Sequence, residues 1–148
     1  MRWSSCSFSN PELWPMQRRL LAWPAAILLI AVVLGAFGAH GLKGKISPEA
    51  LGQWGTGVQY QFYHGLGMLM VVALGGVLPP ATVVRSIRLF GLGILLFSGS
   101  LYLLSTRELT GLASAGAWIG PLTPLGGLAF LAGWATVLIT ALRRNDRG

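Results

Sequence analysis

Polar side chains that could take part in chemistry stand at the ends of several long apolar runs of this sequence. The two histidines, His40 and His64, carry imidazoles that can bind a metal ion or sense pH near neutrality. Hydroxyl, phenol and amide side chains accompany them. The complete candidate polar cluster is His40, Tyr60, Gln61, His64, Ser98, Ser100, Tyr102 and Thr123. What this cluster can do depends on the elements that bring its members together.

A metal centre is poorly supported by these residue types. Zinc is held by three or four protein ligands, and the chain offers only two histidines near its apolar runs. Glu49 and Glu108 are the carboxylates that could be added, and both fall in segments expected outside the membrane. Cys6 is the single cysteine, which excludes a thiolate metal site. No metal and no other cofactor is expected.

Catalysis and proton-coupled transport are also poorly supported. A histidine could approach Ser98 or Ser100, but no acidic residue at the same depth would orient the imidazole. Proton relays in membranes normally contain an ionisable residue deep in a span, and none is expected here. An enzyme that uses His40 and His64 is therefore the least favoured hypothesis, and we expect a protein that is not an enzyme.

The composition indicates the bilayer as the solvent of this chain. Among its 148 residues, 53% are hydrophobic and 10% are charged, whereas soluble domains carry about 25% charged residues. The Lys and Arg residues flank apolar runs instead of forming a stripe, so nucleic acid is not an expected partner. The length allows one domain.

Four apolar runs predict an all-α fold, an integral membrane four-helix bundle. About 20 helical residues are needed to cross the hydrocarbon layer. A flexible cytoplasmic tail over residues 1–19 precedes the transmembrane domain, residues 20–144, and a second tail follows over residues 145–148. Met16, followed by Gln17, Arg18 and Arg19, resembles an alternative translation start. The expected spans are residues 20–39, 62–78, 87–105 and 124–142.

The second helix has a well-defined start. Ser47 offers a side-chain cap, Pro48 suits the first helical position, and Glu49 complements the helix dipole. This helix is expected to begin outside the membrane before its apolar part crosses. Pro79 and Pro80 are expected to end it, and Arg85 and Arg88 to lie in the turn that follows.

The distribution of basic residues predicts the orientation. Three basic residues fall on the expected outer side, Lys43, Lys45 and Arg107. The larger group falls on the other side and comprises Arg2, Arg18, Arg19, Arg85, Arg88, Arg143, Arg144 and Arg147. Both termini are therefore expected in the cytoplasm, in a multi-pass protein of the inner (plasma) membrane.

Small residues at helical spacing predict close packing within the bundle. Ala31, Gly35 and Ala39 repeat at four-residue intervals in the first span, and Ala129 and Gly133 do so in the fourth. Such spacing lets neighbouring backbones approach closely in lipid. Trp134 lies inside the fourth span, away from its ends, and is expected to fill space in the packing.

Topology predicts that the polar cluster gathers at one depth near the outer face. Its members end the first span, open the second and fourth, and occupy the outer half of the third. Two hypotheses remain. The side chains can join the helices through interhelical hydrogen bonds, or they can form an outward-facing pocket for a small ligand or ion.

Four segments resemble a known family. They read LGAFGAHGL at 34–42, VQYQFYHG at 58–65, FSGSLY at 97–102 and TPLGGLAFLAGW at 123–134. In this order the chain is similar, over about residues 20–144, to the bacterial domain-of-unknown-function 423 family, related to eukaryotic transmembrane protein 256. The resemblance implies a small multi-pass inner-membrane protein and supplies no cofactor and no catalytic residues. Its motif positions fall on His40, Gln61, His64, Ser98, Ser100, Tyr102 and Thr123.

The leading functional hypothesis is a non-enzymatic accessory or interaction protein, whose partners are the lipid bilayer and other membrane proteins. The alternative is a small-ligand or ion-binding, channel-like protein with an outward-facing polar pocket around the two histidines.

Overall fold

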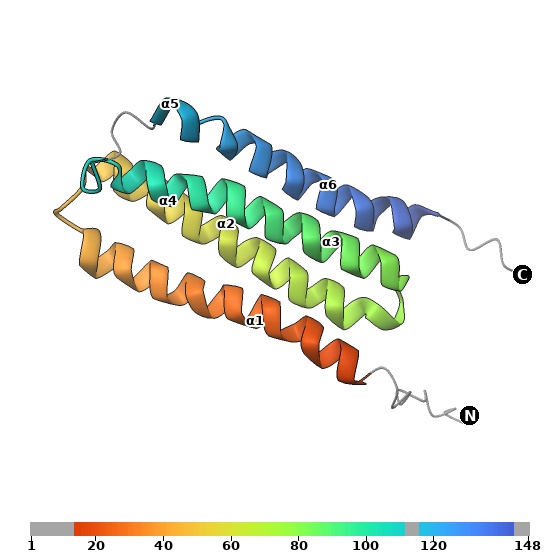
Figure 1. Cartoon of the computed structure of the whole chain (residues 1–148). Coiled ribbons are helices and arrows are strands. Elements are labelled where there is room, and N and C mark those ends of the chain that lie inside the picture. Colours follow the sequence, from red (N-terminus) through yellow and green to blue (C-terminus); the bar gives the residue numbers. More distant parts are fainter. Residues whose placement is uncertain (1–13, 112–115, 144–148) are drawn as a thin grey trace, which may run out of the picture.

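The computed structural model describes residues 14–111 and 116–143, and these form four long helical rods that lie side by side (Figure 1). No strand occurs in the described ranges, so the all-helical class is confirmed for them. The start of the first rod and the end of the fourth lie at the same end of the bundle (Figure 1). In chain order the elements are α1 (Trp14–Ala36), η2 (Phe37–Leu42), α2 (Pro48–Ala73), η3 (Leu74–Gly76), α3 (Pro80–Gly93), η4 (Ile94–Ser98), α4 (Gly99–Thr106), α5 (Gly116–Ile119) and α6 (Leu122–Leu142).

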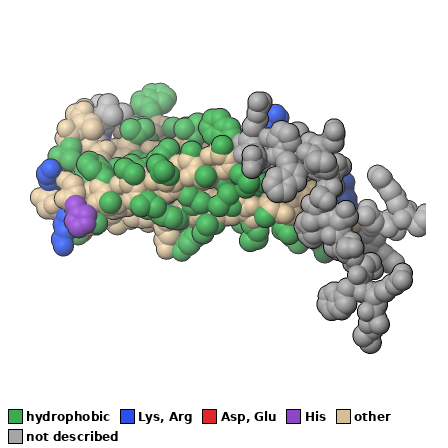
Figure 2. Space-filling model, turned by 90° about the horizontal axis from the view of Figure 1, so that it is seen from below, with side chains coloured by type: hydrophobic (Ala, Val, Ile, Leu, Met, Phe, Trp, Pro, Cys, Tyr) green, Lys and Arg blue, Asp and Glu red, His purple; other side chains and the backbone are tan. Residues whose placement is uncertain are grey.

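Three of the rods are long and apolar enough to cross a membrane. They are Leu20–Leu42, Pro80–Thr106 and Leu122–Leu142. The α2 helix is as long as these but carries Gln59, Gln61 and His64, which lower its hydropathy. Apolar side chains cover most of the visible face between the two ends of the bundle, and Lys or Arg side chains appear at both ends (Figure 2).

The helix ends follow local chemistry and differ from the expected bounds in three places. The first helix begins at Trp14, so residues 14–19 are helical and not part of a loose tail; the rest of that tail and residues 145–148 lie outside the described ranges. The second helix stops at Ala73, before Gly75 and Gly76, which have low helix propensity. The third begins at Pro80, because proline fits a first helical position.

Two predictions about α2 and α3 meet different outcomes. The cap of α2 is confirmed, since the Ser47 hydroxyl accepts a hydrogen bond from the Ala50 backbone N–H at 3.2 Å. The prediction of a turn that contains Arg85 and Arg88 is wrong. Both residues lie on α3, because nothing between Pro80 and Arg88 interrupts the helix.

Glycines set the distance between α6 and the third rod. A Cβ on Gly126 would lie 2.4 Å from the Phe97 backbone nitrogen, and one on Gly133 would lie 2.5 Å from the Phe90 ring. Ala129, between them in the chain, is also buried. The prediction that Ala129 and Gly133 face a neighbouring helix is therefore confirmed, and the contact lies within the chain.

The stripe of small residues on the first rod is confirmed in part. Ala31 is fully buried, and a Cβ on Gly35 would lie 3.5 Å from Val58 on α2. Ala39, however, is exposed, and Gly38 instead packs against the Trp54 indole. The stripe thus continues at the period of a helix, about 3.6 residues, and not at strict four-residue spacing.

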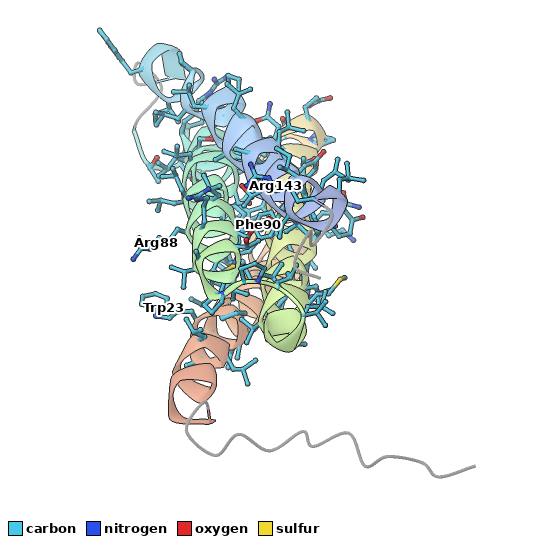
Figure 3. All side chains as sticks on the ribbon, turned by 90° about the vertical axis from the view of Figure 1, so that its right-hand side faces the viewer. Trp23, Arg88, Phe90 and Arg143 are labelled. Carbon is cyan, nitrogen blue, oxygen red and sulfur yellow. The ribbon has the colours of Figure 1, made fainter. Side chains whose placement is uncertain are left out.

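One end of the bundle combines outward aromatic and basic side chains. Trp23 on α1 and Arg88 on α3 project outward, whereas Phe90 points inward among the helices (Figure 3). Arg143, at the end of α6, is exposed. Tryptophan and arginine are residue types typical of the headgroup layer of a membrane.

Candidate functional site

His64 lies buried between helices and against an aromatic ring. It is a residue of α2, and its side chain is 6% exposed. Its imidazole stacks on the Phe130 ring of α6, with centroids 3.5 Å apart and planes inclined by 9°. Its Nδ1 lies 2.9 Å from the Tyr60 carbonyl oxygen, one helical turn earlier. These two contacts fix the orientation of the ring.

The hydrogen bond to Tyr60 also fixes the tautomer of the neutral ring. A carbonyl oxygen only accepts, so Nδ1 must carry the hydrogen and donate it. Nε2 of the neutral imidazole is then an acceptor. No hydrogen bond to Nε2 is present within the described part of the chain, and Nε2 is not among the enclosed, unpartnered polar atoms found there, which are the Ser86 and Ser98 hydroxyl oxygens. His64 therefore offers one free acceptor in largely apolar surroundings.

His64 lines a recess between α2, η4 and α6, which we call the aromatic recess. Its volume is about 380 Å³, within the range of about 300–1,000 Å³ found for small-molecule sites. Its wall is mainly aromatic and aliphatic. The lining residues are Tyr60, His64, Phe97, Pro124, Gly127, Leu128, Phe130, Leu131 and Trp134.

The aromatic side chains of the recess support one another. Tyr60 stacks on Phe97 with centroids 4.5 Å apart and planes inclined by 29°. Trp134 packs against the buried Phe90 ring with centroids 4.9 Å apart. Such contacts hold flat faces in place along the recess. Trp134, expected to fill space only, thus forms part of its wall.

Gln61 joins three helices through its amide. Its Nε2 donates to the Ile27 carbonyl oxygen of α1 at 2.9 Å, and its Oε1 accepts from the Tyr102 hydroxyl of α4 at 2.8 Å. Trp54 packs against the Tyr102 ring, with centroids 4.6 Å apart. Gln61 and Tyr102, both members of the candidate polar cluster, are therefore brought together, and their polar atoms form hydrogen bonds between helices.

Ser100 and Thr123 form a second interhelical pair. Their hydroxyl oxygens are 2.7 Å apart, and the Ser100 hydroxyl also reaches the Phe97 carbonyl oxygen at 2.9 Å. Ser98 is fully buried, and its hydroxyl has no hydrogen-bond partner among the described residues. Ser100 and Thr123 thus tie the third rod to α6, while Ser98 takes no part in that link.

Comparison with known proteins identifies the family. The model of the family described as "Protein of unknown function (DUF423)" matches residues 34–127. The UPF0382 membrane protein YwdK of Bacillus subtilis is 46% identical over 116 residues, which cover 78% of this chain and 89% of that relative. The chain belongs to the DUF423 family.

Other relatives of this DUF423 chain are similar over nearly the same share. The UPF0382 membrane protein SH2409 of Staphylococcus haemolyticus is 39% identical, covering 80% of this chain and 91% of the relative. SERP0230 of Staphylococcus epidermidis is 39% identical, covering 78% and 88%. The family resemblance expected from the four motifs is confirmed, and the chain is a membrane protein. No solved structure matches it.

In this DUF423 protein, His40 lies apart from His64. It is exposed at the end of the first rod, in η2. Its neighbour Gly38 packs against Trp54, which precedes His64 by ten residues on α2. Ten helical residues correspond to about 15 Å along the axis.

The prediction that both histidines share one depth is therefore wrong. The two histidines lie at different depths because α2 is a single helix that runs antiparallel to the first rod. Gly65, next to His64, packs against Ile27 and Leu28, well inside the candidate span Leu20–Leu42. The cluster thus extends from the end of the bundle into its interior. No group of three or more His, Cys, Asp or Glu residues that could hold a metal occurs in the described ranges.

Two π-helical segments overlap sequence motifs of this DUF423 chain: η2 lies within residues 34–42, and η4 shares Phe97 and Ser98 with residues 97–102. The η2 segment contains His40, and η4 contains Phe97 and ends at Ser98. Single π-turns inside α-helices are rare and occur frequently at functional sites. The η4 segment places Phe97 both against Gly126 and in the wall of the aromatic recess.

Proposed function

We propose that this chain is a non-enzymatic, ligand-binding protein of the bacterial inner membrane, which takes up a small apolar molecule in the aromatic recess. The observation that carries the proposal is the unpartnered Nε2 acceptor of His64 in the wall of that recess. Nε2 is accessible and not fully enclosed by protein atoms, so a bound donor can reach it, and a hydrogen bond formed in apolar surroundings is stronger than one formed in water. Of the two functional hypotheses drawn from the sequence, this proposal keeps the one with a small-ligand pocket, and it places His64 but not His40 in that pocket.

The other cluster members support the bundle in this proposal. Gln61 with Tyr102 and Ser100 with Thr123 already use their polar atoms in interhelical hydrogen bonds. Bonds of this kind contribute about 0.6 kcal/mol each in membranes. They hold α2, the third rod and α6 at the distances that leave the recess open.

Filling the recess should remove the ligand. Gly127 lines it, and a Cβ at this position would meet only the Phe97 ring at 4.0 Å, so Gly127→Leu is expected to fold and to occupy the recess. Gly91→Leu is the matched control, because a Cβ there meets nothing within 4 Å and Gly91 does not line the recess. Both proteins would be purified from bacterial membranes in mild detergent, and bound small molecules would be quantified by mass spectrometry.

We expect the Gly127→Leu protein to carry less than about a tenth of the small molecule found with the Gly91→Leu protein, because an added side chain that overlaps a ligand costs well over 1.4 kcal/mol. Equal amounts in both proteins would contradict the proposal. A protein that co-purifies with both variants, in place of a small molecule, would favour the accessory role instead.

We further propose that α2 is the fourth membrane crossing, with both termini in the cytoplasm. The support is that α2 packs along the candidate spans Leu20–Leu42 and Pro80–Thr106 and meets the third through the contact of His64 with Phe130. Basic residues also gather on the side of the termini. A phosphatase reporter inserted at residues 43–47 should be active outside, and one fused after Arg143 should be inactive. Activity after Arg143 would place the termini on opposite sides and leave only three crossings.

A further inference from the structure

The aromatic recess has a chemistry that selects one class of occupant, and this inference rests on the proposed function. Three of its lining side chains are carbocyclic or phenolic rings, Tyr60, Phe97 and Phe130, and an indole and an imidazole join them. Aromatic rings in contact gain about 0.5–1.5 kcal/mol beyond the area that they bury. A flat ring is thus a better occupant than an acyl chain of similar volume.

The free Nε2 of His64 sets the hydrogen-bonding group that the ring must carry beside it, whereas the hydroxyl of Tyr60, which also lines the recess, can donate or accept and does not discriminate. Nε2 accepts and does not donate, because the hydrogen of the neutral imidazole is held on Nδ1 by the Tyr60 carbonyl. The complementary group is an O–H or N–H donor. A ring that carries only carbonyl or ether oxygens would bring a second acceptor to Nε2 and leave both unpaired.

The surroundings of the recess suit an apolar tail. Leu128 and Leu131 line it on α6 and are 60% and 67% exposed on the outer surface of the bundle. A ligand whose ring lies against His64 can therefore extend its tail along α6 in lipid. Entry would be from the bilayer, since His64 lies next to Gly65, which packs well inside the first candidate span.

We propose that the aromatic recess binds the reduced, hydroxyl-bearing form of a tailed benzoquinone, a hydroquinone, in preference to its oxidised form. The hydroquinone donates an O–H to Nε2 of His64, and its ring packs among Tyr60, Phe97 and Phe130. The quinone offers only carbonyl oxygens, which accept. The inference concerns binding and involves no electron transfer.

Three probes with one decyl tail test this preference: decylhydroquinone, decylbenzoquinone and the dimethyl ether of decylhydroquinone. Binding would be measured anaerobically on the full chain in nanodiscs, by native mass spectrometry and thermal shift. We expect the hydroquinone to bind roughly fivefold more tightly than the other two, the effect of one hydrogen bond. In His64→Phe, which keeps a ring able to stack on Phe130, this difference should disappear.

The matched control is His40→Phe, which removes an exposed imidazole outside the recess and should keep the preference. Equal binding of the hydroquinone and its dimethyl ether by the natural chain would overturn the inference and leave the proposed function intact. Equally tight binding of decanol would show that no ring is selected and would also overturn it. The Gly127→Leu variant should abolish binding of the probes. If no probe binds, or if every probe binds this variant as well as the natural chain, both this inference and the proposed function are contradicted.

Discussion

Replacing Gly126 with alanine is expected to lower the free energy of unfolding by about 3 kcal/mol or to prevent folding, although only one methyl group is added. The new Cβ would lie 2.4 Å from the backbone nitrogen of Phe97 and 2.8 Å from its Cα. Backbone atoms cannot change rotamer, so α6 and η4 must separate. The gain of about 1 kcal/mol from replacing a helical glycine offsets only part of this cost.

The adjacent glycine provides the control. Gly127→Ala has the same gain in helix propensity, but its Cβ would meet only the Phe97 ring at 4.0 Å, an ordinary contact. It should leave stability unchanged or raise it slightly. The difference between the two variants, measured by thermal unfolding in mild detergent, isolates the backbone clash. Equal stabilities would show that α6 does not approach η4 this closely.

A second comparison separates backbone from side-chain clashes. A Cβ on Gly133 would lie 2.5 Å from the Phe90 ring, and this side chain can be replaced by a smaller one. Phe90→Leu should therefore restore part of the stability lost in Gly133→Ala. Phe97→Ala should not restore Gly126→Ala, because the Phe97 atoms that clash remain in alanine.

Much of the fold follows from the sequence because local signals are strong in apolar chains. The run of apolar residues that ends at Leu142, and the Ser47–Pro48 start of α2, are confirmed close to the expected positions. The start of the third helix at Pro80 was missed, because the third span was expected to begin at residue 87 and Arg85 and Arg88 were expected in the turn before it. A charged side chain ends a membrane span, but it does not end a helix.

The depth of the candidate residues could not be read from the sequence. It depends on how α2 pairs with the first rod, and this pairing is set by contacts such as Gly38 against Trp54 and Gly65 against Leu28. The sequence placed four residues in the candidate polar cluster without indicating their partners, and the structure pairs Gln61 with Tyr102 and Ser100 with Thr123. Small residues signal that helices pack closely, but not which residues they meet.

The aromatic recess was not predicted from the sequence, because the candidate residues were selected by their polar side chains and most of its wall is apolar. Phe130 and Trp134 stand four residues apart on α6 and share one helix face, which is a detectable signal. Tyr60 and His64 show the same spacing on α2, and both belong to the candidate polar cluster. Joining the two stripes required the knowledge that α2 and α6 both border η4, which only the structure supplies.

Replacing Trp54 with alanine is expected to cost about 3 kcal/mol, as for other buried tryptophans. The indole is 6% exposed, lies with its ring centroid 4.6 Å from that of Tyr102 and 5.7 Å from that of Phe37, and fills the space that Gly38 leaves. Its Nε1 donates to the Leu34 carbonyl oxygen at 2.9 Å. Trp54→Phe keeps a ring but loses this bond, so it should cost about 1 kcal/mol.

The effect of Trp54 should extend to the first rod as a whole. Together with Gln61, it provides the side-chain hydrogen bonds from α2 to backbone carbonyls of that rod, at Leu34 and Ile27. In Trp54→Ala, η2 should separate from α2, and the 43–47 loop should become more sensitive to protease. Trp118→Ala is the control, because that indole is 85% exposed and its loss should change stability by less than about 0.5 kcal/mol. If both alanine variants unfold at the same temperature in detergent, Trp54 does not join these two helices, and the pairing that places His64 in the interior loses its main support.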